Sequence, residues 1–189
     1  AYDVCKSPIL GVTGTNGKTT TTTLLTQVME STGLPVKVGG NIGDSLSEAA
    51  YHMPEGGYLV AELSSYQLET IKSFCPLGAI VLNVTPDHLA RHKTMENYAA
   101  AKARIFMNQT GHNFVVLNDD DPIVAAMKQD AHSTILSISQ HHKVDCGAYF
   151  EGNTCYAVSD GKAIPVIDTE HIHIKGSHNI ENILAVIAL

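Results

Sequence analysis

The segment GVTGTNGKTT, residues 11–20, combines glycines, a lysine and hydroxyl side chains in a spacing suited to binding phosphate. It follows an apolar stretch and opens a helical pattern, which is the setting that a phosphate-binding loop requires. Backbone N–H groups of the loop and of the helix N-terminus would point at the anion, while Lys18 neutralises its charge and the Thr19 hydroxyl binds Mg²⁺. We therefore expect nucleotide contacts at Gly14, Thr15, Asn16, Gly17, Lys18, Thr19, Thr20 and Thr21.

The match of this loop to the general phosphate-loop pattern is imperfect. Val12 stands where the first glycine belongs, and Gly11 comes one place early. The alternative is a glycine-rich turn between a strand and a helix that binds no ligand. The Gly-Lys-Thr sequence at the start of a helix favours the phosphate-binding interpretation.

Polar side chains also follow two other apolar stretches. Glu62 closes GYLVAE, and His88 follows AIVLNVTPD. Ligands of an open parallel sheet bind beyond the carboxyl ends of its strands, so both residues could face the same crevice as the loop. A carboxylate and a neutral imidazole beside a triphosphate are candidate ligands of Mg²⁺ or Mn²⁺. Taken singly, Glu62 could instead be a helix-capping partner and His88 an ordinary loop histidine, but three polar groups at one sheet edge favour a shared site.

Other candidates have simpler explanations. The spacing of Lys102 in an alanine-rich helical stretch predicts a lysine that is solvated or extends towards solvent. The aspartates at 119–121 are explained by a strand end and a helix N-cap before Pro122, and they lack the Asn-Lys-x-Asp arrangement by which switch GTPases read guanine. The histidine pairs His141–His142 and His171–His173 are better explained as exposed residues than as a metal site.

Short apolar stretches alternate with helical patterns over the first three quarters of the chain. The stretches are rich in Val, Ile and Leu without polar alternation, which is typical of parallel strands covered on both faces. We expect strands at 8–12, 36–39, 58–62, 79–83, 114–118 and 134–138, and helices at 18–31, 45–52, 95–108 and 122–129. This alternation predicts right-handed βαβ units and an α/β fold with a doubly wound, mostly parallel sheet.

The character of the sequence changes from about residue 145. Turn residues such as Gly147, Gly152 and Gly161 separate short segments. They predict a small antiparallel sheet over about 145–175, with strands at 148–151, 154–159, 162–167 and 171–174. The chain then ends inside an amphipathic run, 179–189, without a C-cap glycine. We therefore expect residues 1–189 to be one domain of a longer protein.

The composition argues against several classes of protein. The 189 residues are 44% hydrophobic and 16% charged, which is unlike a disordered chain. The net charge of -7 argues against a nucleic-acid partner, because such domains are usually basic. No apolar run reaches the roughly 18 residues of a membrane span, and no secretory signal precedes the first strand. Four cysteines without CxxC spacing fit reduced thiols in the cytoplasm.

Four motifs, in order along the chain, resemble the central ATPase domain of the Mur ligase family. They are TGTNGKT at 13–19, ELSSYQLE at 62–69, NVTPDH at 83–88 and GSHNIEN at 176–182. The resemblance runs from about Ile9 to the last residue, and ELSSYQLE is most similar to the members that add D-glutamate to UDP-N-acetylmuramoyl-L-alanine. It implies ATP-dependent amide formation for peptidoglycan precursors. The substrate carboxylate attacks the γ-phosphate to give an acyl phosphate and ADP, and the D-glutamate amine then displaces phosphate.

The resemblance also implies roles for individual residues. Lys18 and Thr19 would hold the phosphates and one Mg²⁺, while Glu62 and His88 match the ligands of a second Mg²⁺. Lys102 matches a lysine that CO₂ carbamylates, which turns a cation into an anion able to help hold Mg²⁺. Catalytic roles are thus implied for Lys18, His88 and Lys102, metal binding for Thr19, Glu62, His88 and Lys102, substrate contacts for Asn41 and Ser64, and contacts near adenine for His178, Asn179 and Asn182.

One position departs from the family pattern. Ala90 stands where relatives often carry an aspartate, and we expect this change to alter the surroundings of the metal rather than to abolish activity. The family also has an N-terminal domain that binds the UDP part and a C-terminal domain that binds the incoming amino acid. We therefore expect this chain to be a monomer that binds ATP, without nucleic-acid or membrane partners, and to be unable to complete a ligation alone.

Three alternatives remain open at this point. Another Mur ligase or a folylpolyglutamate synthase-type ligase would share the phosphate loop but should differ around Glu62. A nucleotide-binding module that uses ATP for conformation alone would leave Glu62, His88 and Lys102 without a role. A structural domain with a vestigial site is disfavoured by the intact Gly-Lys-Thr.

Overall fold

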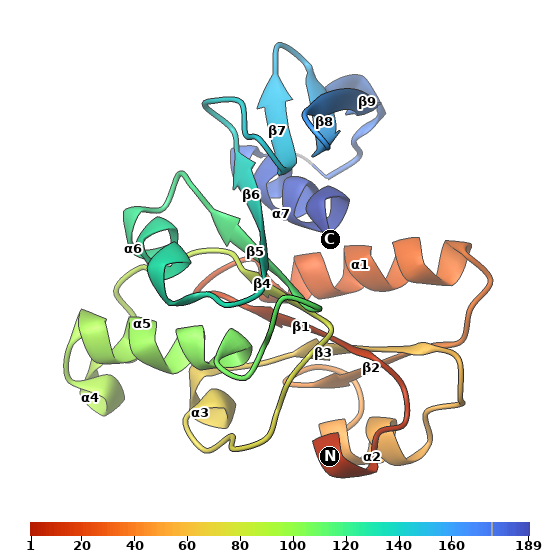
Figure 1. Ribbon diagram of the computed structural model, residues 1–189, viewed down its shortest axis with the longest axis vertical. Coiled ribbons are helices and arrows are strands. Elements are labelled where there is room, and N and C mark those ends of the chain that lie inside the picture. Colours follow the sequence, from red (N-terminus) through yellow and green to blue (C-terminus); the bar gives the residue numbers. More distant parts are fainter. Residues whose placement is uncertain (175) are drawn as a thin grey trace.

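The computed structural model describes residues 1–174 and 176–189. The strands in this part of the chain are β1 (Ile9–Thr13), β2 (Val36–Gly40), β3 (Tyr58–Glu62), β4 (Gly78–Val81), β5 (Phe114–Asn118), β6 (Thr134–Ser139), β7 (Gly147–Glu151), β8 (Thr154–Ser159) and β9 (Lys162–Asp168). The helices are α1 (Lys18–Ser31), α2 (Leu46–Tyr51), α3 (Ser65–Leu68), α4 (Leu89–His92), α5 (Met95–Ala103), α6 (Pro122–Ala126) and α7 (Ser177–Ala188). Figure 1 shows the helices placed on both sides of one continuous sheet.

The sheet is doubly wound, as the sequence predicts. Its strand order is β2-β3-β1-β4-β5-β6-β7-β8-β9, and every pairing from β2 to β7 is parallel. β1 lies between β3 and β4, so the winding reverses there, and the loop after β1 lies at the topological switch point.

Two apolar layers hold the helices against the sheet. Ile9 on β1 packs into the layer under α2, α3, α5 and α6, whereas its neighbour Leu10 packs into the layer under α1 and α7. This alternation follows from the two-residue period of a strand. Leu25 of α1 and Leu184 of α7 are both buried in the second layer, where the two helices contact each other.

The antiparallel strands near the C-terminal end are confirmed, and the structure shows that they extend the main sheet. β7 pairs with β6 in parallel, and β8 and β9 follow as antiparallel neighbours. The strand predicted at 171–174 is wrong. Thr169–His171 forms a single 3₁₀ turn, closed by a hydrogen bond from Ile172 N to Thr169 O, and Ile172 packs against the core of the α7 layer instead of pairing with an edge strand.

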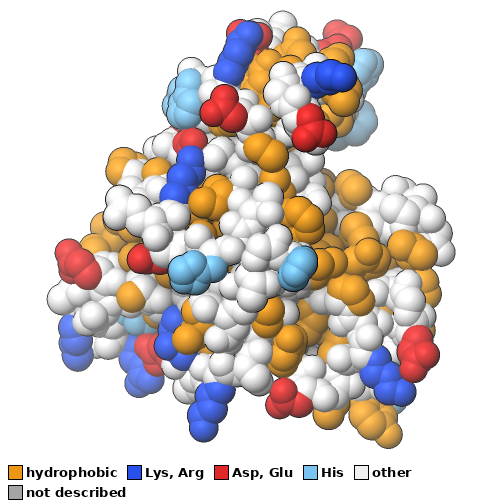
Figure 2. All heavy atoms as spheres, viewed as in Figure 1, with side chains coloured by type: hydrophobic (Ala, Val, Ile, Leu, Met, Phe, Trp, Pro, Cys, Tyr) orange, Lys and Arg blue, Asp and Glu red, His pale blue; other side chains and the backbone are white. Residues whose placement is uncertain are grey.

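The predicted helices differ from the observed ones mainly at their ends. α5 and α6 stop earlier than expected, and the chain continues in 3₁₀ turns at Arg104–Phe106 and Met127–Asp130. The one-turn helices α3 and α4 were not predicted, because four residues are too few to show a helical period. Among the described residues, no helix is long and apolar enough to cross a membrane. Figure 2 shows acidic, basic and histidine side chains interspersed over one face of the molecule.

Candidate functional site

The N-terminus of α1, at the end of the loop that follows β1, leaves backbone N–H groups available to an anion. α1 begins at Lys18 with Gly17 as its N-cap, and within the described residues no side chain caps this helix. Gly17 has φ 82°, a left-handed conformation that glycine adopts without strain. A Cβ at this position would also collide with Oδ1 of Asn182 on α7. Glycine is therefore required here both by the backbone conformation and by the close approach of α7.

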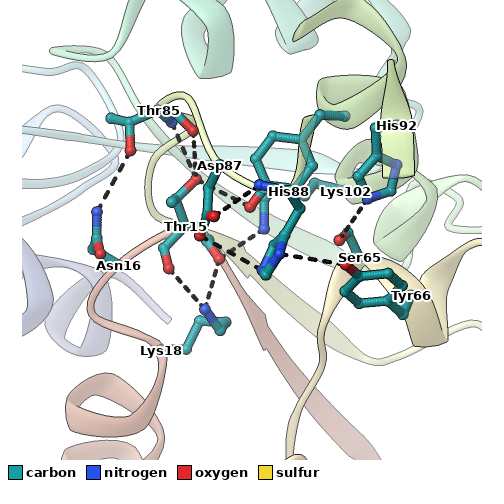
Figure 3. A network of polar contacts seen from close by, with 12 residues as sticks. Thr15, Asn16, Lys18, Ser65, Tyr66, Thr85, Asp87, His88, His92 and Lys102 are labelled. Carbon is teal, nitrogen blue, oxygen red and sulfur yellow. Dashed lines mark hydrogen bonds and ion pairs between the residues drawn. The ribbon is translucent and has the colours of Figure 1, made fainter. Parts of the chain in front are cut away.

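Two lysines converge on this loop. Lys18 Nζ donates hydrogen bonds to the carbonyl oxygens of Gly14 at 3.0 Å and Thr15 at 2.8 Å. Lys102 Nζ, from α5, donates to the same Gly14 oxygen at 2.7 Å and lies 4.5 Å from the centre of the Tyr98 ring. Figure 3 shows both amines directed at the loop. Lys102 is only 1% exposed, so the prediction of a solvated lysine is wrong: α5 packs against the loop, which its spacing could not reveal.

The two amines are electrostatically unequal. Burial, followed by repulsion from Lys18, lowers the pKa of Lys102 from 10.5 to about 7, against an opposing attraction from Asp87. Burial also lowers the pKa of Lys18, while attraction to Glu62 and Asp87 opposes that shift. Lys102 is therefore partly neutral near pH 7.

Glu62 joins two other predicted site residues. It ends β3, is 1% exposed, and accepts a hydrogen bond from Thr19 Oγ1 at 2.8 Å through Oε2. Its Oε1 accepts from Asn41 Nδ2, also at 2.8 Å, and the Asn41 N–H donates to the Glu62 carbonyl oxygen. The helix-capping alternative for Glu62 is not what the structure shows, because the following helix, α3, is capped by Ser64 and Gln67.

His88 lies on the Lys102 side of the loop. It precedes α4 with φ 52°, and its exposed ring has Nδ1 3.3 Å from the Tyr66 hydroxyl and Nε2 3.5 Å from Asp87 Oδ2. The ring centre is 6.1 Å from that of Tyr98, and the Tyr98 ring centre is 4.5 Å from Lys102 Nζ. Tyr98 therefore links His88 to the buried amine.

The remaining predicted residues flank the loop. Asn182 Oδ1 accepts a hydrogen bond from Thr21 Oγ1 at 3.1 Å, and its Nδ2 donates to Asn179 Oδ1 at 3.2 Å. His178 is exposed beside them in the first turn of α7. Ser64 serves as the cap of α3, with its hydroxyl 2.8 Å from Gln67 Oε1.

Sequence reasoning missed Tyr98 and Asn83 as site residues. The Tyr98 hydroxyl is 3.3 Å from Thr15 Oγ1, and its ring supports Lys102. Asn83 Oδ1 accepts a hydrogen bond from Asn16 N at 2.8 Å. The signal that could have found Asn83 is its position after β4, at the same sheet edge as the loop.

One simpler explanation from the sequence is confirmed. Asp121 caps α6 by accepting hydrogen bonds from Ile123 N and Val124 N, with Pro122 in the first turn. His141, His142, His171 and His173 are all exposed.

These features define an α/β domain of the phosphate-loop class, with two lysines and a buried carboxylate at the switch point of the sheet. A model of the Mur ligase middle domain matches residues 12–189, and the chain belongs to this family.

Named relatives narrow the comparison. The chain is 48% identical over 98% of its length to a UDP-N-acetylmuramoylalanine--D-glutamate ligase of Thermoanaerobacter pseudethanolicus, and 42% identical over its full length to the enzyme of that name from Clostridioides difficile. It spans only 41% and 42% of these proteins.

Solved structures support the fold. A UDP-N-acetylmuramoyl-L-alanyl-D-glutamate--2,6-diaminopimelate ligase matches 97% of the chain with a TM-score of 0.77 at 26% identity, and the chain covers 42% of it. MurF from Acinetobacter baumannii matches 98% of the chain with a TM-score of 0.75, and the chain covers 43% of it. Its 18% identity shows a shared fold alone.

Proposed function

We propose that this chain is the ATP- and Mg²⁺-binding part of an enzyme that joins D-glutamate to UDP-N-acetylmuramoyl-L-alanine in the synthesis of peptidoglycan precursors. The observation that carries the proposal is the meeting of Lys18 and Lys102 at the carbonyl oxygen of Gly14. The Lys18 amine and the uncapped N-terminus of α1 suit a ligand with several negative charges, such as the triphosphate of ATP, and Lys102 lies beside them for the metal-binding role described below. The names of relatives that are 42% and 48% identical support D-glutamate as the added amino acid.

Thr19 and Glu62 fit a Mg²⁺ ion. Both offer oxygen atoms, which are the ligands that Mg²⁺ prefers in proteins. The Glu62 carboxylate is buried and bonded by a hydroxyl and an amide, which are neutral groups, so a cation bound there would balance its charge. Bound Mg²⁺ would neutralise phosphate charge and polarise the phosphoryl group that is attacked.

Lys102 fits a second metal site only after it has been modified. An ammonium group cannot bind a cation, but a pKa of about 7 leaves part of the side chain as the neutral amine. The amine nitrogen can attack CO₂, forming a C–N bond and releasing a proton, and the resulting carbamate is an anion. With His88 on the same side of the loop, this carbamate would complete the ligands of a second Mg²⁺.

The residues of the chain then manage charge during the reaction. A substrate carboxylate must approach a polyanionic triphosphate, and Lys18 with the backbone N–H groups of the loop lowers the repulsion and holds the γ-phosphate for in-line attack. Attack forms an acyl phosphate and releases ADP. The D-glutamate amine then displaces phosphate to form the amide. Asn41 and Ser64 would contact the substrate, while Asn179 and Asn182, with His178 beside them, would lie near the adenine.

The chain would act as the central domain of a three-domain cytoplasmic enzyme. Because it spans about two fifths of its relatives, we infer that the remainder binds the UDP part and the incoming amino acid. By this proposal the 189-residue chain is a monomer that binds nucleotide but forms no amide product.

The proposal is tested first by thermal melts of the chain with and without Mg-ATP, beside the variant Lys18→Ala. Ligand at about 100 times its dissociation constant should stabilise the wild-type fold by roughly 2.7 kcal/mol. The shift should be lost in the variant. A folded wild-type chain that shows no shift contradicts nucleotide binding by this domain.

The reaction itself is tested in the full-length enzyme. Lys18→Ala should slow the formation of amide product, because the variant loses transition-state stabilisation on the order of 3 kcal/mol. D-glutamate should be consumed in preference to L-glutamate and diaminopimelate. A preference for another amino acid would favour a sister ligase, and ATP binding without acyl transfer would favour a nucleotide-binding module.

A further inference from the structure

Asn83 follows the neighbouring strand β4 and forms hydrogen bonds to the backbone of the phosphate loop. Its Oδ1 accepts a hydrogen bond from Asn16 N at 2.8 Å, and its Nδ2 donates to Asn16 O at 3.3 Å. The Asn83 carbonyl oxygen accepts a third bond, from Thr15 N at 2.9 Å. Asn83, two residues beyond the end of β4, thus fixes the backbone of two successive loop residues. The proposed reaction gives no reason for this arrangement.

The orientation of the Asn83 amide is set by Glu181. This glutamate lies on α7, and its Oε1 accepts a hydrogen bond from Asn83 Nδ2 at 2.8 Å. A carboxylate can only accept, so it selects the rotamer in which the NH₂ group faces α7 and Oδ1 faces the loop. In the flipped rotamer, Oδ1 would face the carboxylate and the NH₂ group would face the N–H of Asn16, so that both contacts would be repulsive.

The position of Glu181 is costly for a carboxylate. Burial raises its pKa, and the charges of Asp121 and Asp120 raise it further, against hydrogen bonds from Asn83 and Asn118. An apolar side chain of similar size would avoid this cost if the position served packing alone. The hydrogen bond to Asn83 explains why an acceptor side chain occupies this position.

We propose that Glu181 and Asn83 are positioning residues for the phosphate loop: Glu181 orients the Asn83 amide, which holds Asn16 so that the N–H groups that follow it, at the N-terminus of α1, stay directed at the nucleotide phosphates. The proposal rests on the proposed nucleotide binding for its functional consequence. It also makes α7 a support for both the loop and the first turn of α1, because Asn182 of the same helix accepts a hydrogen bond from Thr21.

The test compares Glu181→Leu, which removes the acceptor, with Glu181→Gln, whose amide oxygen can still accept from Asn83. Glu48→Leu, at an exposed glutamate of α2 on the opposite face of the sheet, is the matched control. Mg-ATP affinity is measured by calorimetry on the 189-residue chain, and stability by urea unfolding. Glu181→Leu should weaken Mg-ATP binding by about tenfold, the order expected for one lost hydrogen bond to a charged group. Glu181→Gln and the control should stay close to wild type.

Amide hydrogen exchange provides a readout that does not depend on nucleotide. The Asn16 N–H should exchange about tenfold faster in Glu181→Leu, because its hydrogen bond to Asn83 opens more often. The N–H of Val12 in β1 should be unchanged. Glu181→Gln should restore wild-type exchange, which a general loss of packing would not allow.

The outcomes separate the two proposals. Unchanged exchange at Asn16 in Glu181→Leu, or faster exchange with unchanged Mg-ATP affinity, overturns the positioning role. If the wild-type chain binds no Mg-ATP, nucleotide binding fails while exchange still decides whether Glu181 fixes the loop. If Glu181→Leu does not fold, Asn83→Ser takes its place, with the same exchange and affinity expected.

Discussion

Lys18 and Lys102 donate hydrogen bonds to a single acceptor, the carbonyl oxygen of Gly14, at 3.0 Å and 2.7 Å. Their amines repel each other across this shared oxygen, and the repulsion acts on top of the burial of Lys102. The folded chain therefore holds Lys102 in an environment that favours its neutral form. An anion bound at the loop would offset the electrostatic repulsion between the two amines.

The first prediction concerns the pH dependence of stability. The unfolded chain keeps Lys102 protonated up to its ordinary pKa of 10.5, whereas the folded chain releases the proton near pH 7. Between these values the unfolded state binds more protons, so the free energy of unfolding rises with pH. The free-energy cost of burying Lys102 is thus largest below pH 7. At about 1.4 kcal/mol per pKa unit it reaches roughly 5 kcal/mol there, and it decreases as the pH rises towards 10.5.

Lys102→Met keeps the apolar stem and removes the charge. We expect the variant to be more stable than wild type at neutral pH by roughly 2–4 kcal/mol, with the gap narrowing by about 1.4 kcal/mol per pH unit up to about pH 9. Urea unfolding across this pH range measures the difference in stability and how it changes with pH. For Lys72→Met, at an exposed lysine, the free energy of unfolding should change with pH as it does for wild type. If the free energies of unfolding of Lys102→Met and wild type change with pH in parallel, burial does not lower the pKa of Lys102.

A second prediction separates the two reasons for glycine at position 17. Gly17 and Gly33 have nearly the same left-handed φ, 82° and 80°, but a Cβ at Gly33 would meet nothing within 4 Å. Gly33→Ala should therefore cost only the conformational strain, about 1 kcal/mol. Gly17→Ala should cost about 2–4 kcal/mol, because the added methyl group also displaces Asn182. Equal losses in urea unfolding would mean that α7 yields freely at this contact.

A third prediction concerns the cap of α6. Asp121 accepts hydrogen bonds from Ile123 N and Val124 N, and its other oxygen accepts from Val84 N at 2.8 Å. Asp121→Ala should lose the cap, about 1 kcal/mol, and also leave the buried Val84 N–H unpaired, for roughly 2–4 kcal/mol in total. Asp121→Asn keeps one acceptor oxygen and should fall midway. A loss below about 0.5 kcal/mol in Asp121→Ala would mean that water replaces these bonds.

The fold was largely predictable from the sequence, because buried parallel strands can be recognised as short apolar runs. β3, β5 and β8 have the predicted bounds, and so does α1, whose start is marked by the glycine-rich loop. The segment 171–174 was mistaken for a strand because Ile172 and Ile174 alternate with histidines, a pattern that an edge strand and a packed connection share.

The candidate site was predictable only in part. Lys18 and Thr19 stand in a local motif, whereas the burial of Lys102 depends on how α5 packs against Gly14 of the loop, 88 residues earlier in the chain. Sequence spacing does not predict a contact over that separation. Resemblance to a family, and not periodicity, brought Lys102 into the site. The partnership of Asn83 with Glu181 likewise joins residues 98 positions apart.

The last prediction tests whether Glu62 holds Mg²⁺. Glu62→Gln preserves the shape of the side chain, and its amide oxygen can still accept from Asn41 Nδ2, so we expect the variant to fold with at least wild-type stability once the buried charge is removed. Thr19 would keep a hydrogen-bonding partner through rotation of its hydroxyl. What the variant loses is the negative charge that would attract a cation.

The measurement is therefore a difference between two thermal shifts, one with ATP and Mg²⁺ and one with ATP and EDTA. Wild type should gain extra stabilisation from Mg²⁺, and Glu62→Gln should show nearly the same smaller shift under both conditions. Lys18→Ala is the contrasting control, because it should lose the shift with and without the metal ion. If Glu62→Gln keeps the whole Mg²⁺-dependent gain, the cation is held by the phosphates and Thr19 alone, and the buried carboxylate serves to anchor Asn41 against α1.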